Sequence, residues 1–353
     1  MSRIPVRRAI VSVADKSGLE ELGRRLAAAG AEIVSSGGTA AFLARSGVAV
    51  TLVSDVTGMA EMFGGRVKTL HPSIHGGILA DLWRDDHRAD LEREGIKPID
   101  LVVVNLYPFS ATVSGREVGE EEAIEQIDIG GPTLIRAAAK NHARVGVVTS
   151  HLWYEMVAAE VEAGGIDDDL RRRLAREAFF HTAAYDAAIV TWLEREEELP
   201  ARLVLPLRRQ AVLRYGENPH QKGALYLEDG AREPWTQYHG KEMSFNNHLD
   251  ADAAWRLVQE LEDPGCAIVK HTNPCGVARA GTPDEAFRRA WGCDPRSAYG
   301  GVVAVNRPLD RDVARAMTTA GFVEVVIAPT IRSEALDLLE KSKNLRVLAA
   351  GPP

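Results

Sequence analysis

Residues 64–77 concentrate chemically active side chains between pairs of glycines, in the order GGRVKTLHPSIHGG. Arg66 and Lys68 supply fixed cations there, Thr69 supplies a hydroxyl, and two histidines add imidazoles. Glycine pairs let the backbone take turn geometries closed to other residues and let a ligand approach closely. Because the whole chain has a formal net charge of −8, this local cluster predicts a site for a small anionic substrate. The alternative interpretation is a polar surface loop, since charged loops are common.

A second group of residues is suited to holding a phosphate. Ser12 and Lys16 follow the first predicted strand. Ser36, Gly38 and Thr39 follow the second strand and lie directly before a predicted helix. Small residues at a helix start expose backbone N–H groups, and the helix dipole adds partial positive charge. A phosphate site is therefore predicted here, with an ordinary helix cap as the alternative.

A third group could move protons. Asn105 and Tyr107 stand at the end of a predicted strand, and Asp128 precedes a helix that runs into Lys140. A carboxylate and an ammonium in different environments can divide acid from base work. Lys140 could equally be a solvated cation that stabilises the helix end. Tyr107 could equally be an aromatic residue packed at the sheet edge.

The second half of the chain offers one further reactive pair. The apolar run 266–269 predicts a buried strand that leads directly into Lys270 and His271. A lysine can steady an oxyanion beside a histidine that acts as a general base near its natural pKa. The alternative is a pair of surface residues. Arg214 and Tyr215, in the turn-rich stretch LRYGENPHQ, are candidate nucleotide contacts.

The elements that would position these groups alternate between strand and helix. A capping box of Ser17 and Glu20 is expected to start a helix that ends at Gly30. This alternation predicts an α/β fold with a parallel sheet and right-handed crossovers, in which ligands bind at the carboxyl ends of the strands. Strands are expected over residues 9–13, 32–35, 48–53, 101–104 and 145–148, and further helices over 40–45 and 168–194.

Length and composition indicate an ordinary two-domain protein. A single core seldom grows beyond roughly 250 residues, so the 353 residues are expected to form two domains, 1–199 and 200–353. Hydrophobic residues make up 45% and charged residues 26%, as in soluble globular proteins. The acidic net charge argues against a general nucleic-acid or membrane surface. The absence of a signal peptide or a long apolar run favours the cytoplasm.

Neither disulfides nor a metal site are expected. The cysteines, Cys266, Cys275 and Cys293, form no CxxC pair and are expected to be reduced. His71 and His75 have the four-residue spacing of helical metal ligands. The intervening proline and the following glycines are expected to spoil that helix, so structural or substrate-orienting roles are favoured.

A series of long and unusual stretches spans the chain between residues 11 and 329: SVADKSG, SSGGTA, GGRVKTLHPSIHGGILA, NLYPF, QIDIGGPTLIRAAAKNHARV, LRYGENPHQ, FNNHLDADAAW, KHTNPCGVA, SAYGG and EVVIAP. Together they resemble the bifunctional AICAR transformylase/IMP cyclohydrolase family of purine biosynthesis. The resemblance implies a first domain of methylglyoxal-synthase-like α/β fold, followed by part of an α/β transformylase domain.

For the first domain, the resemblance implies closure of the purine ring of formyl-AICAR to IMP with loss of water. The implied nucleotide- and phosphate-binding residues are Ser12, Lys16, Ser36, Gly38, Thr39, Arg66, Thr69 and Asn105. The implied catalytic residues are Lys68, Tyr107, Asp128 and Lys140.

For the second domain, the resemblance implies formyl transfer from 10-formyltetrahydrofolate, a co-substrate, to AICAR. His271 is the implied proton acceptor and Lys270 the implied transition-state stabiliser. No tightly bound cofactor is implied. Family members are homodimers with transformylase sites at the subunit interface, so a homodimer is expected. The implied AICAR-binding residues are Arg214, Tyr215, Asn247, Gly300 and Glu324, the last replaced by Asp in some members.

The chain stops at Pro353, whereas family members continue through the rest of the transformylase domain. We therefore expect cyclohydrolase activity to survive and transformylase activity to be absent or very weak. Two alternatives share the fold of the first domain. A regulatory ligand-binding module would not need Tyr107, Asp128 and Lys140 together, and a methylglyoxal synthase would not explain KHTNPCGVA.

Overall fold

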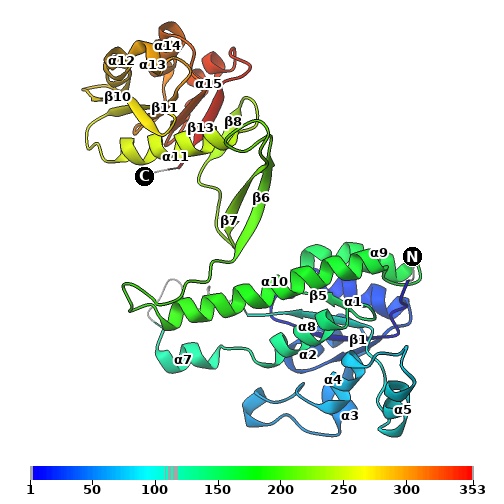
Figure 1. Cartoon of the computed structure of the whole chain (residues 1–353). Helices are drawn as coiled ribbons and strands as arrows, with labels where there is room; N and C mark the ends of the chain where they lie inside the picture. The colour runs from blue at the N-terminus through cyan, green and yellow to red at the C-terminus, as the bar shows by residue number, and fades with distance from the viewer. Residues whose placement is uncertain (1–2, 108, 110–112, 114–117, 352–353) are drawn as a thin grey trace. The chain divides into compact units, whose positions relative to one another are not determined.

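The structure is a computed structural model, and it describes residues 3–107, 109, 113 and 118–351. The chain divides into two compact units, Met1–Pro206 and Leu207–Pro353 (Figure 1). Pro108, which belongs to the stretch NLYPF, lies outside the described residues. Among the helices of the described part of the chain, none has the length and apolar character that crossing a bilayer requires.

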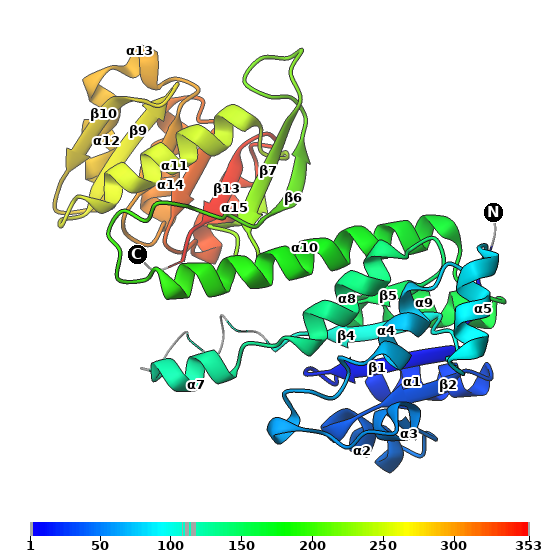
Figure 2. The same cartoon turned by 60° about the horizontal axis from the view of Figure 1, so that its bottom comes forward.

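The first unit is built on a five-stranded sheet in the order β3-β2-β1-β4-β5, with every neighbouring pair parallel (Figure 2). The sequence-predicted parallel α/β architecture is therefore confirmed. Strand order changes direction between β1 and β4, and a ligand crevice opens at such a switch point. The strands are β1 (Arg8–Val13), β2 (Glu32–Ser35), β3 (Thr51–Leu52), β4 (Leu101–Asn105) and β5 (Gly146–Val148).

Helices connect and cover these strands. The longest, α10, is capped by the Asp167 carboxylate, which accepts from the Leu170 N–H at 2.8 Å. Its buried face includes Leu174, Ala178 and Tyr185, as the helical spacing predicts. The helices are α1 (Leu19–Ala28), α2 (Gly37–Arg45), α3 (Val53–Thr57), α4 (Pro72–Leu79), α5 (Asp85–Arg93), α7 (Glu120–Glu125), α8 (Gly130–Lys140), α9 (Tyr154–Glu162) and α10 (Asp168–Leu193), with 3-10 turns η1 (Phe63–Gly65) and η2 (His151–Trp153).

Two local predictions in this unit are wrong. The capping box does not form, because the Ser17 N–H and hydroxyl both donate to Asp15, and Gly18 in a left-handed conformation starts α1 instead. The predicted strand 48–53 shrinks to β3. The Val48 N–H donates to the Leu43 carbonyl at 3.0 Å and completes the end of α2, so Val48 is not available to a strand.

A third correction concerns the two histidines. Pro72 does not prevent a helix; it occupies the first turn of α4, where the missing N–H costs nothing. His71 is the N-cap, and its Nδ1 accepts from the Ser73 N–H at 3.2 Å. His75 lies within the helix, and its Nε2 is buried without a partner in the described part of the chain.

The second unit contains a six-stranded mixed sheet in the order β10-β9-β11-β12-β13-β8. Side chains alternate across it: Ile268 and Val303 belong to one apolar core, and Val269 and Val302 to another. Figure 2 shows α11 crossing one face, and its buried apolar residues, Ala251, Ala254 and Val258, belong to the second core. The strands are β6 (Leu207–Leu213), β7 (Gly223–Glu228), β8 (Thr236–His239), β9 (Gly265–Lys270), β10 (Asn273–Arg279), β11 (Val302–Val305), β12 (Val325–Ala328) and β13 (Arg346–Ala349).

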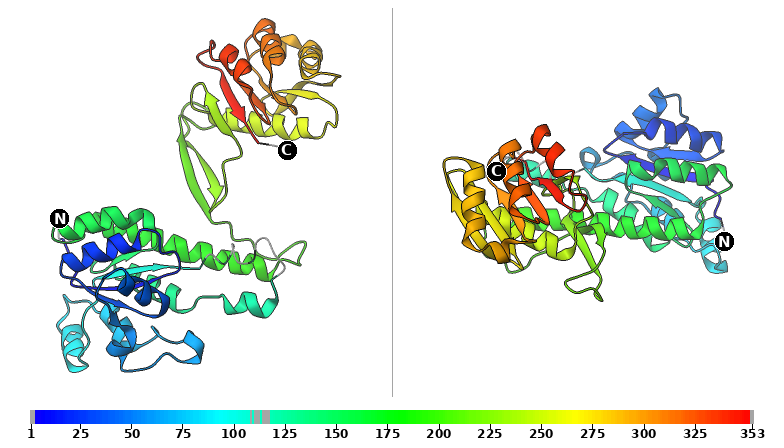
Figure 3. Two further views of the ribbon diagram at one scale, coloured as in Figure 1. Left: turned by 180° about the vertical axis from the view of Figure 1, so that it is seen from behind. Right: turned by 90° about the horizontal axis from the view of Figure 1, so that it is seen from above.

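The helices of the second unit are α11 (Phe245–Gln259), α12 (Pro283–Cys293), α13 (Pro295–Ala298), α14 (Arg311–Ala320) and α15 (Ser333–Leu339). β6 and β7 pair with each other as a separate hairpin, which projects from the rest of the unit (Figure 3). All three free cysteines lie in this unit: Cys266 is buried, Cys275 is half-buried and Cys293 is exposed.

Candidate functional site

The crevice between β1 and β4 is organised by Asn105. Its Oδ1 accepts from the N–H groups of Ala14 and Asp15 at 2.6 and 3.0 Å, and its Nδ2 donates to the Asp15 carbonyl at 3.0 Å. The side-chain amide thus fixes the loop that follows β1. Ser12, at the end of β1, is half-buried. Lys16 extends from the fixed loop, and its ammonium donates to the Ala14 carbonyl at 3.3 Å.

The segment Ser36–Thr39 opens α2 at the end of β2. Ser36 is the N-cap, yet its hydroxyl makes no capping bond within the described structure, so it can meet a ligand. Gly37 has φ +52°, a conformation that favours glycine. The Thr39 hydroxyl is already committed: it accepts from the Val13 N–H at 3.2 Å and donates to the Val13 carbonyl at 3.1 Å. Gly38 is exposed.

Lys68 reaches this helix start from a different segment. A Cβ on Gly37 would lie 3.8 Å from the Lys68 Nζ, and a Cβ on Gly65 would lie at the same distance. The ammonium therefore sits between the two glycine backbones. The first turn of α2 contains no acidic residue to neutralise its dipole. Fixed charge and helix dipole thus converge on one anion-binding position.

Thr69 and Asp128 meet at the start of α8. Thr69 is buried, and a Cβ on Gly130 would lie 3.0 Å from its hydroxyl oxygen. The Asp128 Oδ1 accepts from the Gly131 N–H at 2.9 Å, and the Asp128 N–H donates to the Tyr185 hydroxyl at 2.7 Å. A Cβ on Gly131 would lie 2.4 Å from the carboxylate, so a larger residue at this position would have to displace the Asp128 side chain.

Two residues assigned to this site by resemblance are less closely engaged. The Arg66 guanidinium pairs with the Glu125 carboxylate of α7 on the exposed surface. Tyr107 follows β4 with 56% of its surface exposed, so it is not packed as an edge aromatic. Among the described residues, no hydrogen bond or ion pair holds either side chain toward the crevice between β1 and β4.

Lys140 is separated from Asp128, and the predicted acid–base pair is not formed. Asp128 lies just before α8 and Lys140 at its far end, and the 11 residues of the helix span about 15 Å at 1.5 Å per residue. Lys140 is the exposed last residue of the helix, which fits the alternative of a helix-end cation.

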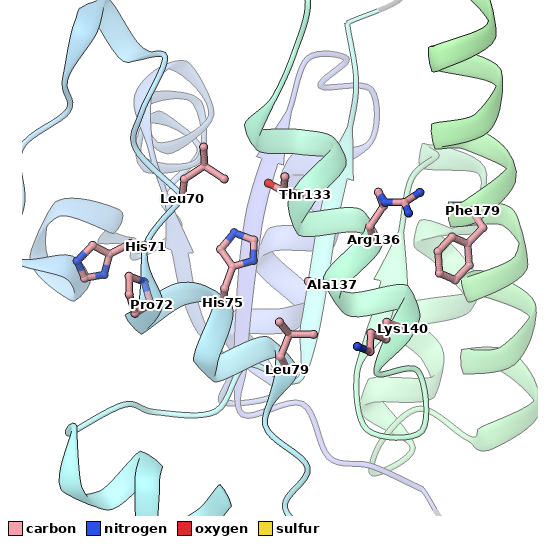
Figure 4. Close-up of a pocket in the computed structure, with 10 residues that line it drawn as sticks. All are labelled: Leu70, His71, Pro72, His75, Leu79, Thr133, Arg136, Ala137, Lys140 and Phe179. Atoms are coloured by element: carbon pink, nitrogen blue, oxygen red, sulfur yellow. The ribbon is translucent and has the colours of Figure 1, made fainter.

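Lys140 instead lines a pocket of about 720 Å³ between α4, α8 and α10. Figure 4 shows His75 and Leu79 of α4 facing Arg136 and Lys140 of α8. The Arg136 guanidinium lies 5.9 Å from the ring centre of Phe179 on α10. The lining residues are Leu70, His71, Pro72, His75, Leu79, Thr133, Arg136, Ala137, Lys140 and Phe179.

The second unit gathers its candidate residues at one sheet edge. β9 is antiparallel to β11, and β11 is parallel to β12, so the carboxyl end of β9 lies at the same edge of the sheet as the amino ends of β11 and β12. Lys270 ends β9, and its Nζ donates to the Tyr299 carbonyl at 2.9 Å. Gly300, with φ +74°, is close to this ammonium: a Cβ there would lie 3.9 Å from the Lys270 Nζ. Glu324 directly precedes β12 at the same edge.

The other residues implied in AICAR binding have structural partners. The Glu324 carboxylate pairs at 3.0 Å with Arg346, whose side chain is 4% exposed. Asn247 is part of a capping box with Ser244 at the start of α11. The Arg214 guanidinium carbon lies 5.7 Å from the Tyr215 ring centre in the β6–β7 loop.

The sequence interpretation missed one residue of this site, Asp250. It is 8% exposed on α11, and its carboxylate accepts from the backbone N–H groups of His271 and Thr272. The residue lies inside the stretch FNNHLDADAAW, but no local pattern links it to a turn so far along the chain. No group of three His, Cys, Asp or Glu residues suited to a metal occurs among the described residues.

Comparisons with known proteins find matches over nearly the whole chain. Residues 18–133 match the family described as "MGS-like domain", and residues 138–353 match "AICARFT/IMPCHase bienzyme". The chain is 50% identical to the bifunctional purine biosynthesis proteins PurH of Mycobacterium ulcerans and Mycobacterium marinum, over 99% of this chain and 69% of each relative. It is 51% identical to PurH of Roseobacter denitrificans, over 98% of this chain and 66% of that protein.

Among solved structures, "Crystal structure of ForH" matches 54% of this chain and all of that chain, with 31% sequence identity and a TM-score of 0.48. The matched MGS-like region confirms the predicted fold of the first domain. Since both family regions occur in order and half of the residues are identical over nearly the whole chain, this protein belongs to the AICARFT/IMPCHase bienzyme family of bifunctional purine biosynthesis.

Proposed function

We propose that the first unit closes formyl-AICAR to IMP and that the second unit carries the residues that transfer a formyl group to AICAR. The formyl donor is 10-formyltetrahydrofolate, used as a co-substrate. Family membership favours this pair of reactions over a regulatory ligand-binding module.

One observation carries the first half of the proposal. Lys68 is placed against Gly37 of α2, and the adjacent Thr69 is placed against Gly130 of α8. These two residues therefore bridge the starts of two helices. A nucleotide phosphate held at α2 would extend its base toward Asp128, which lies at the start of α8.

The chemistry of ring closure fits these groups. The carboxamide nitrogen of formyl-AICAR must attack the formamide carbonyl carbon, and an oxyanion forms as the new C–N bond is made. N–H donors and the Lys68 ammonium stabilise that charge. The carboxamide nitrogen loses a proton to the Asp128 carboxylate, and the oxyanion takes a proton from the Lys68 ammonium to become a hydroxyl. The hydroxyl then takes the proton held by Asp128 and leaves as water, while the ring C=N bond forms and the former formamide N–H returns a proton to Lys68. Holding both ends of the substrate supplies the orientation.

Two separate assays on the purified 353-residue chain test the proposal. One supplies formyl-AICAR and follows IMP; the other supplies AICAR with 10-formyltetrahydrofolate and follows formyl-AICAR. IMP in the first assay supports the ring-closing role of the first unit. Product in the second supports formyl transfer by this chain. Silence in both, from protein that is folded by circular dichroism, overturns the proposal and favours the regulatory module.

We also propose a cytoplasmic homodimer. Apolar side chains on the β6–β7 hairpin support an interface between copies, since Val212 is 67% exposed and Tyr226 is 51% exposed. Light scattering coupled to gel filtration gives the mass directly. A monomeric mass at all concentrations up to about 100 μM would overturn the dimer.

A further inference from the structure

The turn that carries His271 has an unfavourable backbone conformation. His271 and Thr272 form the two-residue connection between β9 and β10, with φ values of +54° and +59°. Two-residue hairpin turns with both φ values positive are normally filled by asparagine, aspartate or glycine. A left-handed conformation is strongly disfavoured for a β-branched residue such as Thr272. Something outside the turn must hold it in place.

Asp250 supplies that restraint. One carboxylate oxygen accepts from the His271 N–H at 3.2 Å, and the other accepts from the Thr272 N–H at 2.7 Å. Bonds to a charged, largely buried acceptor are stronger than neutral ones. The His271 carbonyl is held as well, by the Thr272 hydroxyl at 2.7 Å and the Asn273 Nδ2 at 2.8 Å. The backbone of His271 is therefore fixed on both sides.

We propose that Asp250 is a positioning residue for formyl transfer, acting by clamping the left-handed turn so that the His271 imidazole is presented beside the Lys270 ammonium. Chain reversal alone would not need this arrangement, because an Asn-Gly turn would form without a clamp. The turn instead keeps a histidine and a strained threonine. The role of Asp250 in catalysis rests on the proposed function of Lys270 and His271; the clamp itself does not.

The experiment uses the 353-residue chain and three variants. Asp250→Asn replaces one acceptor by a donor at nearly constant shape. Asp250→Asn combined with Thr272→Gly also removes the strain at the second turn position. Asp252→Asn is the matched control, because Asp252 lies on the same helix with an exposed side chain that pairs with Arg256.

Three readouts are compared. Amide hydrogen exchange at His271 and Thr272 is expected to accelerate at least about tenfold in Asp250→Asn, as one local hydrogen bond is lost. The imidazole nitrogen shifts of His271, followed by NMR in the free protein, are expected to move toward those of an unrestrained histidine. In the formyl-transfer assay, kcat is expected to fall about tenfold while the KM for AICAR stays within about twofold.

The double variant is expected to recover the imidazole shifts and most of kcat without recovering the protected amides. The proposal is overturned if Asp250→Asn leaves amide exchange unchanged. It is also overturned if the melting temperature falls while the imidazole shifts stay as in the wild type, because Asp250 is then merely structural. If the wild-type chain transfers no formyl group, the proposed function of this unit fails, and the exchange and shift data still decide whether the clamp positions His271.

Discussion

The two candidate sites both present cations to an anionic substrate, but different structural elements hold those cations in place. In the first unit, helix starts rich in glycine and the Lys68 ammonium concentrate positive potential at the carboxyl ends of parallel strands. In the second unit, the reactive pair lies on a strained antiparallel hairpin whose turn is held by the buried Asp250, and at the same sheet edge the buried Arg346 pairs with Glu324. The first site depends on close backbone approach, whereas the second depends on ion pairs and clamps.

This difference has a consequence for mutation. A site made of backbone N–H groups loses function when a reactive side chain is removed, while the fold around it survives. A site held by buried charges loses stability when one partner is removed, because the other charge is left without compensation. Each prediction below separates the two kinds of site, beginning with the largest effect.

Replacement of Lys68 by alanine is expected to give the largest loss. Ring closure should fall by about 10²–10³-fold or more, since one cation that stabilises the developing oxyanion is removed. The melting temperature should stay within about 2 °C of the wild type, because Lys68 contributes to the site and not to the core. Lys97→Ala, at an exposed lysine of the same unit, is the control. Near-normal turnover would remove Lys68 from the mechanism.

Glu324→Gln tests whether removing one partner of a charged pair in the second unit lowers stability. Arg346 is almost fully buried, and loss of its partner should cost about 2–3 kcal/mol of unfolding free energy, less than for a fully buried pair because Glu324 is 38% exposed. Urea unfolding measures this, with the exposed Glu340→Gln as the control. Unchanged stability with weakened AICAR binding would instead make Glu324 a substrate contact.

Ser36→Ala probes the phosphate loop. Affinity for formyl-AICAR is expected to fall about tenfold, or about 1.4 kcal/mol, because the hydroxyl is a ligand donor and not a helix cap. Ser46→Ala removes a hydroxyl at the other end of α2, where it bonds the Phe42 carbonyl, and should leave the affinity unchanged. Isothermal titration separates the two. Unchanged affinity in both would support an ordinary helix start.

Both units contain a histidine whose pKa is lowered by burial, His75 and His248. A lowered pKa in the folded state means that protons favour the unfolded chain. The contribution of the neutral, buried histidine to the free energy of unfolding is therefore fully present above the unfolded-state pKa of about 6.5. It is lost as the pH falls below that value. His248→Phe keeps an aromatic ring stacked on Trp235 but removes the titrating imidazole. Between pH 7.5 and 5.5, the melting temperature of this variant should therefore fall by a few degrees less than that of the wild type. The exposed His220→Phe is the control, and equal pH dependence would contradict this account.

Lys140→Gln is expected to have the smallest effect, with ring closure within about twofold of the wild type. The residue lies at the far end of α8 from Asp128. Arg136→Gln, at another cation of the same pocket, is the matched comparison. A loss of activity as large as that of Lys68→Ala would contradict this prediction. It would indicate that Lys140 takes part in ring closure and that α8 moves during turnover.

The sequence predicts what depends on neighbours along the chain. The strand Glu32–Ser35 and the helix Asp168–Leu193 agree closely with expectation, because their periodicity and capping are local. The placement of the predicted phosphate loop between a strand and a helix start also agrees with expectation, since it depends on local sequence. The separation of Asp128 from Lys140 follows from their positions before the start and at the end of one predicted helix.

Other features depend on contacts between distant segments. Asp250 lies on a helix, and the turn that it clamps lies beyond the following strand. Arg346 and Glu324 meet because β12 and β13 are neighbours in the sheet. No spacing rule connects such residues, so only the family resemblance assigned Glu324 to substrate binding, and Asp250 was not identified. The exact use of the Thr39 hydroxyl was likewise decided by the packing of α2 against β1.

The three cysteines differ in exposure, so thiol labelling can report the unfolding of the second unit. Burial raises the pKa of the Cys266 thiol, and Cys266 on β9 has no exposed surface, so it is inert until the sheet opens. Cys293 is exposed and should react with a maleimide at once. A mass spectrometer counting added labels over time would therefore report the opening of the second unit alone, without a fluorophore and without an engineered residue.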